Sequence, residues 1–461
     1  MNRLTRTLTF AIAGFSALLP IQAKELPTLP GANVALHIQD LKTGEVFNSY
    51  SSDQWMQPAS TQKVLTALVA KQRLGTDFRY TTSIHQDQRG AVINFSGDPT
   101  LNRTQLSSLL KQARSQQRNL FDGDIYLVSN TFVGENRAVG IPWDTLGVCY
   151  AAPATGIALD KNCIQGSIYS NRDVGEPARV HVPAHHLISV DNQVTVVSKE
   201  QQQQTQCEMR LQAFANNHYL LTGCLVQRDQ PLPLRFALQD PKTYIADVIR
   251  AELKKQGVNV KGTIYTSDKP ATSAALSTHH SPSLMPLLAM VLQDSNNILT
   301  DSLLRHIGAK DGSGSFSFGT EVMRQHLAAL LNDEQWLTTP LNDGSGLSRN
   351  NRLTTQQLAQ VITYITQHEP ELLALFPVSG ESGTLRYRRS LRGDTLKGKV
   401  QAKTGSLYGA SNLAGIVTTS SGRELLVVQL VNDYFWKWQP RTTSPLQQFE
   451  RALYTELVTE Y

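Results

Sequence analysis

The chain is poor in charge, in cysteine and in long apolar runs, and each shortage excludes a class of protein. Only 18% of its 461 residues are charged, the formal net charge is +5, and no run of Lys or Arg concentrates it. A dedicated nucleic-acid binder gathers basic residues into a stripe, so we expect no nucleic-acid partner. The weak positive excess favours at most loose contact with a membrane face. Because 40% of the residues are hydrophobic, the chain has enough apolar material for a large core, which excludes a disordered protein.

The apolar stretch near the N-terminus is too short to cross a bilayer, which needs about 20 residues. Arg3 and Arg6 precede it, Pro20 interrupts it, and Ala23 offers a small residue for cleavage. This pattern is typical of a secretory signal peptide over residues 1–23, and the alternative is a buried N-terminal helix. We therefore expect an exported chain that folds in an oxidising compartment.

The cysteines are few but even in number, standing at Cys149, Cys163, Cys207 and Cys224. In an oxidising compartment they predict two disulfides. Three pairings are possible and the sequence does not decide between them; we favour Cys149–Cys163 and Cys207–Cys224, which close short loops. Zinc is the alternative, but the sequence has no Cys-x-x-Cys and its His pairs at 185–186 and 279–280 lack metal-type spacing, so we expect no metal.

Regular patterns occupy both ends of the chain. Residues 34–47 alternate around a turn and predict a hairpin, and residues 58–74 carry an apolar helical face that ends at Gly75. The C-terminal part predicts helices over 284–292, 298–307, 320–331, 354–368 and 446–461, and strands over 399–403, 413–418 and 424–431. We expect the hairpin and these strands to share one antiparallel sheet flanked by helices, which is an α+β fold.

The middle of the chain has a different pattern of apolar and polar residues. From about residue 80 to 270, short alternating runs recur between turns, with one helix expected near 105–117 and a polar Gln tract at 201–204. All four cysteines lie in this stretch. We therefore predict one discontinuous domain made of residues 24–80 and 271–461, interrupted by a β-rich insertion over residues 81–270 with two subdomains.

The first motif with chemical content is Ser60-Thr61-Gln62-Lys63, at the start of a predicted helix. A spacing of three places Ser60 and Lys63 on nearly the same helix face. A neutral amine held there takes the hydroxyl proton, and the helix N-terminus favours developing negative charge. A serine before an apolar helix is also an ordinary N-cap, and Ser108 and Lys111 share the spacing, so the motif is weak by itself.

The second motif, Ser295-Asn296-Asn297, lies between two predicted helices. A hydroxyl and an amide aimed into a cleft from such a turn relay a proton and bind a substrate carbonyl. Turns and helix caps use the same residues, so this motif is also unspecific when taken alone.

The third motif, Lys403-Thr404-Gly405-Ser406, ends an alternating strand. Gly405 has no side chain and lets a bound peptide lie close to the strand, while Lys403 and Thr404 offer a cation and a hydroxyl to an anion. The backbone N–H groups of Ser60 and Ser406 would form an oxyanion hole. The alternative is a strand end with a solvated lysine.

In this order, the three motifs match the set found in penicillin-binding proteins and class A β-lactamases, with Asn296 in the middle position. The long insertion between Ser60 and Ser295 narrows the match: the chain resembles the class C low-molecular-mass penicillin-binding proteins, of the penicillin-binding protein 4 type. Local runs that agree are residues 97–101, 343–349 and 403–407. The resemblance covers nearly the whole mature chain and implies a penicillin-binding, β-lactamase-like fold with a large insertion.

The resemblance implies a serine D,D-carboxypeptidase and D,D-endopeptidase that acts on peptidoglycan stem peptides in the periplasm and is inhibited covalently by β-lactams, with no cofactor. It also implies a role for each motif residue: Ser60 is the nucleophile, Lys63 its base, Ser295 the proton donor to the leaving amine, Asn297 the group that orients the substrate amide, Lys403 and Thr404 the carboxylate binders, Arg349 a contact for the acidic cross-link residue, and Asp144 the acidic residue ahead of the first cysteine.

Three other functions remain as alternatives. A catalytically silent wall-binding module is disfavoured because the motif residues are intact. A β-lactamase would use the same acyl chemistry but has no evident use for the long cysteine-bearing insertion. A cytosolic hydrolase conflicts with the predicted signal peptide.

Overall fold

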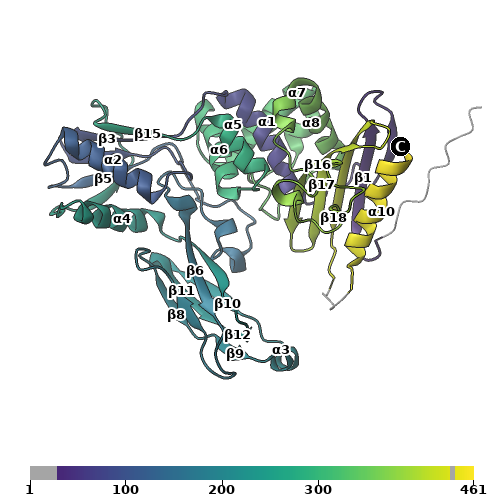
Figure 1. Cartoon of the computed structure of the whole chain (residues 1–461). Helices are drawn as coiled ribbons and strands as arrows, with labels where there is room; N and C mark the ends of the chain where they lie inside the picture. Colours follow the sequence, from purple (N-terminus) through teal and green to yellow (C-terminus); the bar gives the residue numbers. More distant parts are fainter. Residues whose placement is uncertain (1–28, 437–441) are drawn as a thin grey trace, which may run out of the picture.

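A five-stranded antiparallel sheet joins the two ends of the chain (Figure 1). The structure, a computed structural model, describes residues 29–436 and 442–461, so the expected signal peptide lies outside the described residues. The strands run in the order β16-β17-β18-β1-β2, with bounds Val400–Leu407, Ala410–Thr418, Glu424–Asn432, Asn33–Asp40 and Val46–Tyr50. The predicted sheet, shared by the N-terminal hairpin and the C-terminal strands, is confirmed.

Both faces of this sheet are covered, because successive side chains of a strand point to opposite sides. In β18, Leu426 and Val428 pack into the core formed with the helices of one face, whereas Leu425 and Val427 pack under helix α10 on the other. The helical side contains α1 (Lys63–Leu74), α5 (Leu284–Leu292), α6 (Asn297–Asp311), α7 (Phe316–Leu331), α8 (Thr355–His368) and α9 (Pro370–Leu373), and the opposite face is covered by α10 (Pro445–Glu460).

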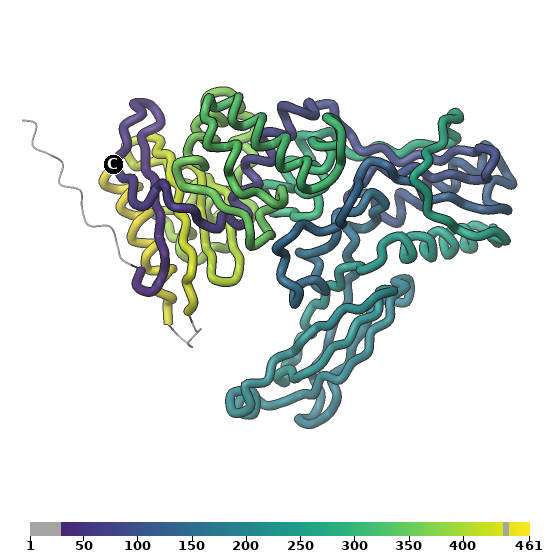
Figure 2. The backbone as a smooth tube through the Cα atoms, turned by 180° about the vertical axis from the view of Figure 1, so that it is seen from behind, coloured from purple at the N-terminus to yellow at the C-terminus, as the bar shows by residue number. Residues whose placement is uncertain are grey.

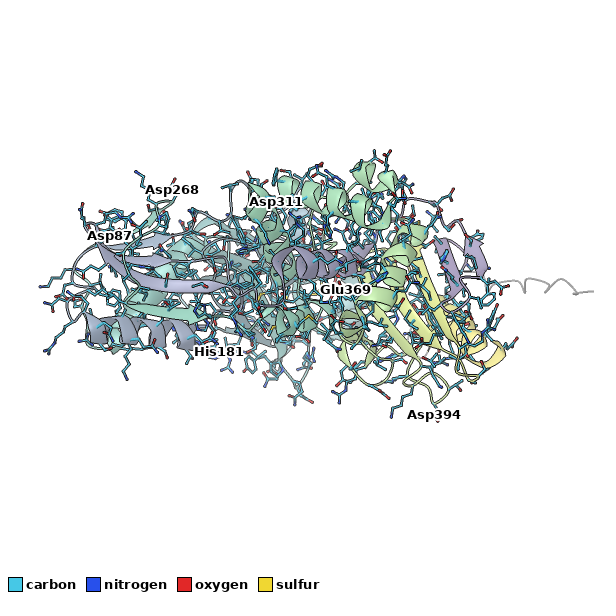
Figure 3. The ribbon with its side chains drawn as sticks, turned by 90° about the horizontal axis from the view of Figure 1, so that it is seen from above. Asp87, His181, Asp268, Asp311, Glu369 and Asp394 are labelled. Carbon is cyan, nitrogen blue, oxygen red and sulfur yellow. A yellow bond between two sulfur atoms is a disulfide. The ribbon has the colours of Figure 1, made fainter. Side chains whose placement is uncertain are left out.

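Residues 81–128 and 241–280 form a second sheet with two helices, which extends past residue 270, the predicted end of the insertion. Its strand order is β14-β5-β4-β3-β15, with bounds Ile264–Ser267, Ile125–Val128, Gly90–Asn94, Thr81–Asp87 and Ser277–His280. Helices α2 (Arg103–Gln116) and α4 (Pro241–Lys255) pack against one face and share its apolar core. Figure 3, seen from above, places Asp87 and Asp268 at this end of the elongated molecule and Asp394 towards the other.

A second lobe of the insertion projects away from the rest of the chain (Figure 2). It is built from small sheets in the orders β13-β6-β7, β10-β11-β8 and β12-β9. The strands are β6 (Cys163–Tyr169), β7 (Arg179–His181), β8 (Ser189–Asn192), β9 (Thr195–Val197), β10 (Arg210–Phe214), β11 (His218–Thr222), β12 (Cys224–Val226) and β13 (Leu232–Ala237).

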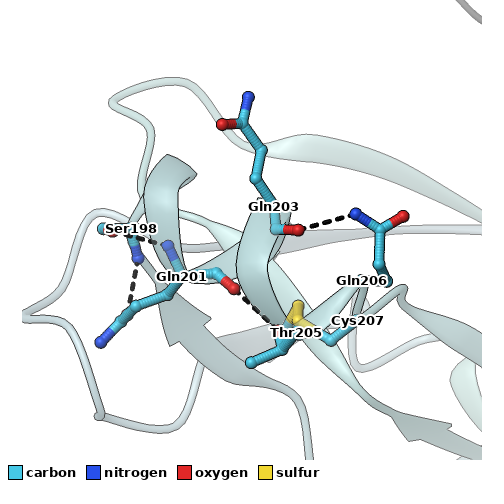
Figure 4. The surroundings of a disulfide bond; sticks show 7 residues. Ser198, Gln201, Gln203, Thr205, Gln206 and Cys207 are labelled. Atoms are coloured by element: carbon cyan, nitrogen blue, oxygen red, sulfur yellow. Dashed lines mark hydrogen bonds between the residues drawn. A yellow bond between two sulfur atoms is a disulfide. The ribbon is translucent and has the colours of Figure 1, made fainter.

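Both disulfides that we favoured are present, Cys149–Cys163 and Cys207–Cys224. The first ties the short 3-10 helix at Cys149–Ala151 to β6, and the second ties the segment after helix α3 to β12. Figure 4 shows Cys207 beside α3 (Lys199–Thr205). Each disulfide restricts the unfolded chain and so stabilises the folded lobe.

The insertion holds more helix than we predicted. The Gln tract at 201–204, which we placed among turns, lies in α3, where the side chain of Ser198 accepts from the Gln201 N–H and closes a capping box. Helix α4 was missed, although Asp240 caps it and Pro241 starts it. Among the described residues, no helix is both long and apolar enough to cross a membrane.

Candidate active site

Ser60 and Lys63 face each other where a tight 3-10 turn becomes a helix. The turn spans Ala59–Gln62 and Lys63 is the first residue of α1, so the helix begins later than the predicted residue 58. The Lys63 Nζ atom lies 2.9 Å from Ser60 Oγ. Ala59 has a φ of 48°, a left-handed conformation that costs a side-chain-bearing residue free energy and aims the following serine.

The amine of Lys63 is enclosed by oxygen atoms. Besides Ser60 Oγ, it lies 2.7 Å from Asn297 Oδ1 and 2.6 Å from the Ser345 carbonyl oxygen, and its side chain is fully buried. Burial lowers the pKa of Lys63 to about 8, against the opposing charges of Asp301 and Asp343. A substantial fraction of this amine is therefore neutral near physiological pH.

Two buried carboxylates hold the Ser345 carbonyl in place. Asp301, on α6, accepts hydrogen bonds from the backbone N–H groups of Gly344 and Ser345, at 3.1 and 2.9 Å. Asp343 accepts from the N–H groups of Gly346 and Ser348, each at 2.7 Å. Burial and the neighbouring Asp343 raise the pKa of Asp301. These contacts fix the loop that supplies one of the three oxygens around Lys63.

Ser295 lies in the turn between α5 and α6, as predicted, with a left-handed φ of 57°. The Lys403 Nζ atom donates to Ser295 Oγ at 2.9 Å and to the Thr404 carbonyl oxygen at 2.9 Å. Lys403 is fully buried, and burial together with the positive charge of Lys63 lowers its pKa. The second and third motifs are thus joined by a direct contact between their side chains.

The edge strand of the sheet, β16, borders these groups. The N–H of Ala402 donates outward, away from β17, to the Pro377 carbonyl oxygen, and the Val400 N–H donates outward to Ser379 Oγ. Because N–H directions alternate along an antiparallel strand, the Ser406 N–H also points outward, away from β17. The Thr404 hydroxyl lies beside it and donates to Thr384 Oγ1 at 2.7 Å.

Gly405 lets the serine-bearing turn pack directly on β16. A Cβ atom at this position would lie 2.7 Å from the Pro58 carbonyl oxygen and 3.0 Å from the Thr61 N atom, both backbone atoms. We expect Gly405→Ala to shift Ser60 from the edge strand and to lower the acylation rate at least ~100-fold, since misplacement of about 1 Å has that effect. Penicillin acylation kinetics measure this.

Gly393→Ala is the matched control, because a Cβ at Gly393 meets no atom within 4 Å. It should leave the acylation rate within about twofold of the wild type, as expected for a surface change. Equal rates for Gly405→Ala and Gly393→Ala would contradict the role of this contact.

The insertion reaches the site through Tyr150. The Asn297 Nδ2 atom donates to the Tyr150 carbonyl oxygen at 2.8 Å, which fixes the amide so that its oxygen faces Lys63. Tyr150 directly follows Cys149, whose disulfide to Cys163 anchors this segment. Tyr150 is 53% exposed, although its carbonyl oxygen is bound by Asn297.

Arg349 and Asp144 are both close enough to Tyr150 for their charges to act on it. The Arg349 guanidinium donates to the Tyr408 carbonyl oxygen at 2.7 Å and to Gln57 Oε1 at 3.3 Å. Asp144 lies in an exposed 3-10 turn. Burial and the Asp144 charge raise the pKa of Tyr150, and the Arg349 charge opposes this, so both charges act on one ring.

The motifs did not identify three groups of the site: Asp301, the Ser345 carbonyl and the Tyr150 carbonyl. Asp301 stands four residues after Asn297, hence one helical turn further along α6, which is a signal that the sequence contained. The two carbonyl groups left no side-chain signal. The part of the chain that the structure describes contains no group of three or more His, Cys, Asp or Glu placed to hold a metal ion.

The site pairs a serine nucleophile with a buried amine beside the edge strand of an antiparallel sheet. This arrangement defines a serine enzyme of the penicillin-binding type. A family model described as the D-Ala-D-Ala carboxypeptidase 3 (S13) family matches residues 17–453, and the chain belongs to this family. The protein is a serine-type D-Ala-D-Ala carboxypeptidase, as the resemblance implied.

Relatives agree with this assignment. A D-alanyl-D-alanine carboxypeptidase of Haemophilus influenzae, DacB, is 33% identical over 93% of this chain and 91% of its own length. A D-alanyl-D-alanine carboxypeptidase of an Actinomadura species is 28% identical over 89% of this chain and 79% of its own. The crystal structure of penicillin-binding protein 4 from H. influenzae superposes with a TM-score of 0.84 at 32% identity, covering 94% of this chain and 97% of that one. The predicted α+β, penicillin-binding fold is therefore confirmed.

Proposed function

We propose that Ser60 attacks the carbonyl carbon of the penultimate D-alanine while Lys63 accepts its proton. The observation that carries this is the set of neighbours around the Lys63 amine. The oxygens of Asn297 and Ser345 are carbonyl acceptors, so a neutral Lys63 amine donates its two N–H groups to them. Its lone pair then faces the Ser60 hydroxyl, which is the one neighbour able to donate a proton.

The oxyanion of the tetrahedral intermediate lies between the N–H groups of Ser60 and Ser406. Ser295, held by Lys403, passes a proton to the leaving amine, which departs as D-alanine and leaves an ester on Ser60. Ser295 receives in turn the proton that Lys63 took from Ser60, so Lys63 is neutral again. Water then attacks the ester, Lys63 takes the water proton, and Lys63 returns this proton to the Ser60 oxygen as the ester breaks. The second Nδ2 hydrogen of Asn297 orients the substrate amide, because the first is bound to Tyr150.

The substrate's terminal carboxylate binds to Lys403 and the Thr404 hydroxyl at the end of the site. The cross-link residue of peptidoglycan carries both a carboxylate and an amine, which suit Arg349 and Asp144, the two charged residues that act on Tyr150. We therefore propose that the enzyme also acts as a D,D-endopeptidase on peptide cross-links between stem peptides.

A β-lactam is expected to acylate Ser60 and to inhibit the enzyme. The H. influenzae relative has been solved in complex with a β-lactam, at 32% identity and a TM-score of 0.79. Peptidoglycan stem peptides are the proposed substrates, and the N-terminal pattern of Arg3, Arg6 and a short apolar stretch supports a periplasmic location.

Product analysis tests this proposal. Purified enzyme is incubated with a muropeptide ending in D-Ala-D-Ala and with a cross-linked dimer, and the products are separated by mass. We expect free D-alanine from the first and two monomers from the second, with both reactions blocked by penicillin. Release of D-alanine without cleavage of the dimer would refute the endopeptidase proposal, and fast turnover of penicillin instead of blockage would indicate a β-lactamase.

A further inference from the structure

A pocket of about 640 Å³ lies at the far end of the catalytic edge strand, beyond the residues that hold the reacting groups. It surrounds the two-residue turn, Tyr408 and Gly409, between β16 and β17. Tyr434, Phe435 and Trp436, which follow β18, form its wall, and Gln447 at the start of α10 closes it. Its volume is in the range of small-ligand sites.

Aromatic rings line this pocket and remain open to solvent. Tyr408 is 81% exposed and Phe435 is 63% exposed, and their ring centroids lie 5.1 Å apart. Such rings are normally buried, so a paired and exposed set marks a binding surface. Gly409 makes the pairing possible, because a Cβ there would lie 2.8 Å from the Phe435 ring.

Hydrogen bonds fix the wall of the pocket. The Tyr434 N–H donates to the Gly409 carbonyl oxygen at 3.1 Å, and the Leu446 N–H donates to the Tyr434 hydroxyl oxygen at 3.3 Å. The turn, the segment after β18 and the start of α10 are therefore held together. A preformed surface of this kind binds a ligand without a large ordering cost.

The pocket also contains an unused cation. Arg389 lines it and is exposed, and no ion-pair partner of Arg389 is found among the described residues. Its neighbour Arg388 differs, because its guanidinium is paired with Glu450 beneath the sheet. Aromatic faces together with an arginine and a glutamine match a sugar ring that carries hydroxyl and amide substituents. The C–H groups of the ring pack on the aromatic faces, and its hydroxyl and carbonyl oxygens accept hydrogen bonds from the arginine and the glutamine.

The direction in which the proposed substrate lies along β16 places its glycan-bearing end near this pocket. Its terminal carboxylate lies at Lys403 and Thr404 and its scissile carbonyl at Ser406, so the preceding residues run along β16 toward Tyr408. An extended peptide advances about 3.3 Å per residue, and the three steps from Ser406 to Gly409 cover about 10 Å. The end of the stem peptide that is attached to the glycan therefore reaches the aromatic pocket.

We propose that this pocket, lined by Tyr408, Phe435, Trp436 and Arg389, is a subsite for the muramyl sugar to which the stem peptide is attached. The inference rests on the proposed function, since it uses the substrate direction set by Lys403 and Ser406. The enzyme then recognises a stem peptide by both of its ends, and prefers peptides still attached to glycan.

Two substrates test the subsite: N-acetylmuramyl-pentapeptide and the same pentapeptide with an acetyl group in place of the sugar. For Phe435→Ala and Trp436→Ala, we expect kcat/KM to fall about tenfold on the muramyl substrate, equal to about 1.4 kcal/mol. On the acetyl-pentapeptide, kcat/KM should change less than twofold. Arg389→Gln should reproduce the selective loss without removing an aromatic ring.

Tyr265→Ala is the matched control, because Tyr265 is an aromatic residue, 44% exposed, on β14 of the insertion. It should leave both substrates unaffected. Equal losses on both substrates, or no loss on either, would overturn the subsite. Failure of the wild-type enzyme to cleave either substrate, or to be acylated by penicillin, would instead overturn the proposed function, so the two failures are distinguishable.

Discussion

Ser60→Ala is expected to abolish covalent labelling by penicillin and to reduce release of D-alanine by at least ~10⁴-fold. The physical reason is that no other nucleophile lies against the Lys63 amine: the remaining neighbours are carbonyl oxygens of Asn297 and Ser345. Loss of a catalytic nucleophile typically costs this much or more. Labelling with fluorescent penicillin, followed by mass analysis of the modified peptide, measures the effect.

The chain supplies its own control for this experiment. Ser108 and Lys111 repeat the Ser-x-x-Lys spacing on α2, but Ser108 is exposed on the outer side of the insertion. Ser108→Ala should therefore label and turn over like the wild type. Normal labelling of Ser60→Ala would assign the nucleophile elsewhere and refute the mechanism.

Lys63→Met is expected to be the next most damaging change, with acylation slowed at least ~1,000-fold, because general-base catalysis is lost while the apolar stem is kept. In the wild type, the pKa of Lys63 is lowered to about 8, and only the neutral amine accepts a proton. The acylation rate should therefore rise with pH below about 8 and level off above it. Stopped-flow measurement of penicillin acylation between pH 5.5 and 9.5 gives this profile.

Lys63→Arg separates the base from the charge. A guanidinium keeps the positive charge but remains protonated throughout this pH range, so the variant should be as inactive as Lys63→Met. An active Lys63→Arg enzyme, or a rate that falls as the pH rises through 8, would contradict the assignment of Lys63 as the base. Lys111→Met, on α2, serves as the control for loss of an exposed lysine.

Sequence patterns predicted the parts of this structure that depend on local periodicity and on side-chain chemistry. The near-continuous apolar run in residues 424–431 and the helical period in 354–368 identified a central strand and the helix that packs on it. The three motifs identified Ser60, Ser295 and Lys403, because each needs a particular side chain. The joining of these groups by direct contacts, such as Lys403 to Ser295, was not predictable from spacing.

The groups that were missed act through the backbone or through tertiary context. The carbonyl oxygens of Ser345 and Tyr150 complete the surroundings of Lys63 and Asn297, and any residue type supplies a carbonyl. Helix α4 was missed in a stretch dominated by strands, although its cap and its buried face were present in the sequence. The apolar core that this segment shares with α2 makes it a helix and not a strand.

The pairing of β1 with β18 has a consequence for how the enzyme is made. Asn33 lies opposite Asn432, so the central sheet closes only after nearly the whole polypeptide has left the ribosome. Contacts of such long sequence separation make folding slow. Until that closure, β16 has no complete sheet to join and Ser60 has no edge strand beside it. Newly made chains are thus inert toward peptide bonds until the sheet closes, and the hydrolytic activity appears only at that final step of folding.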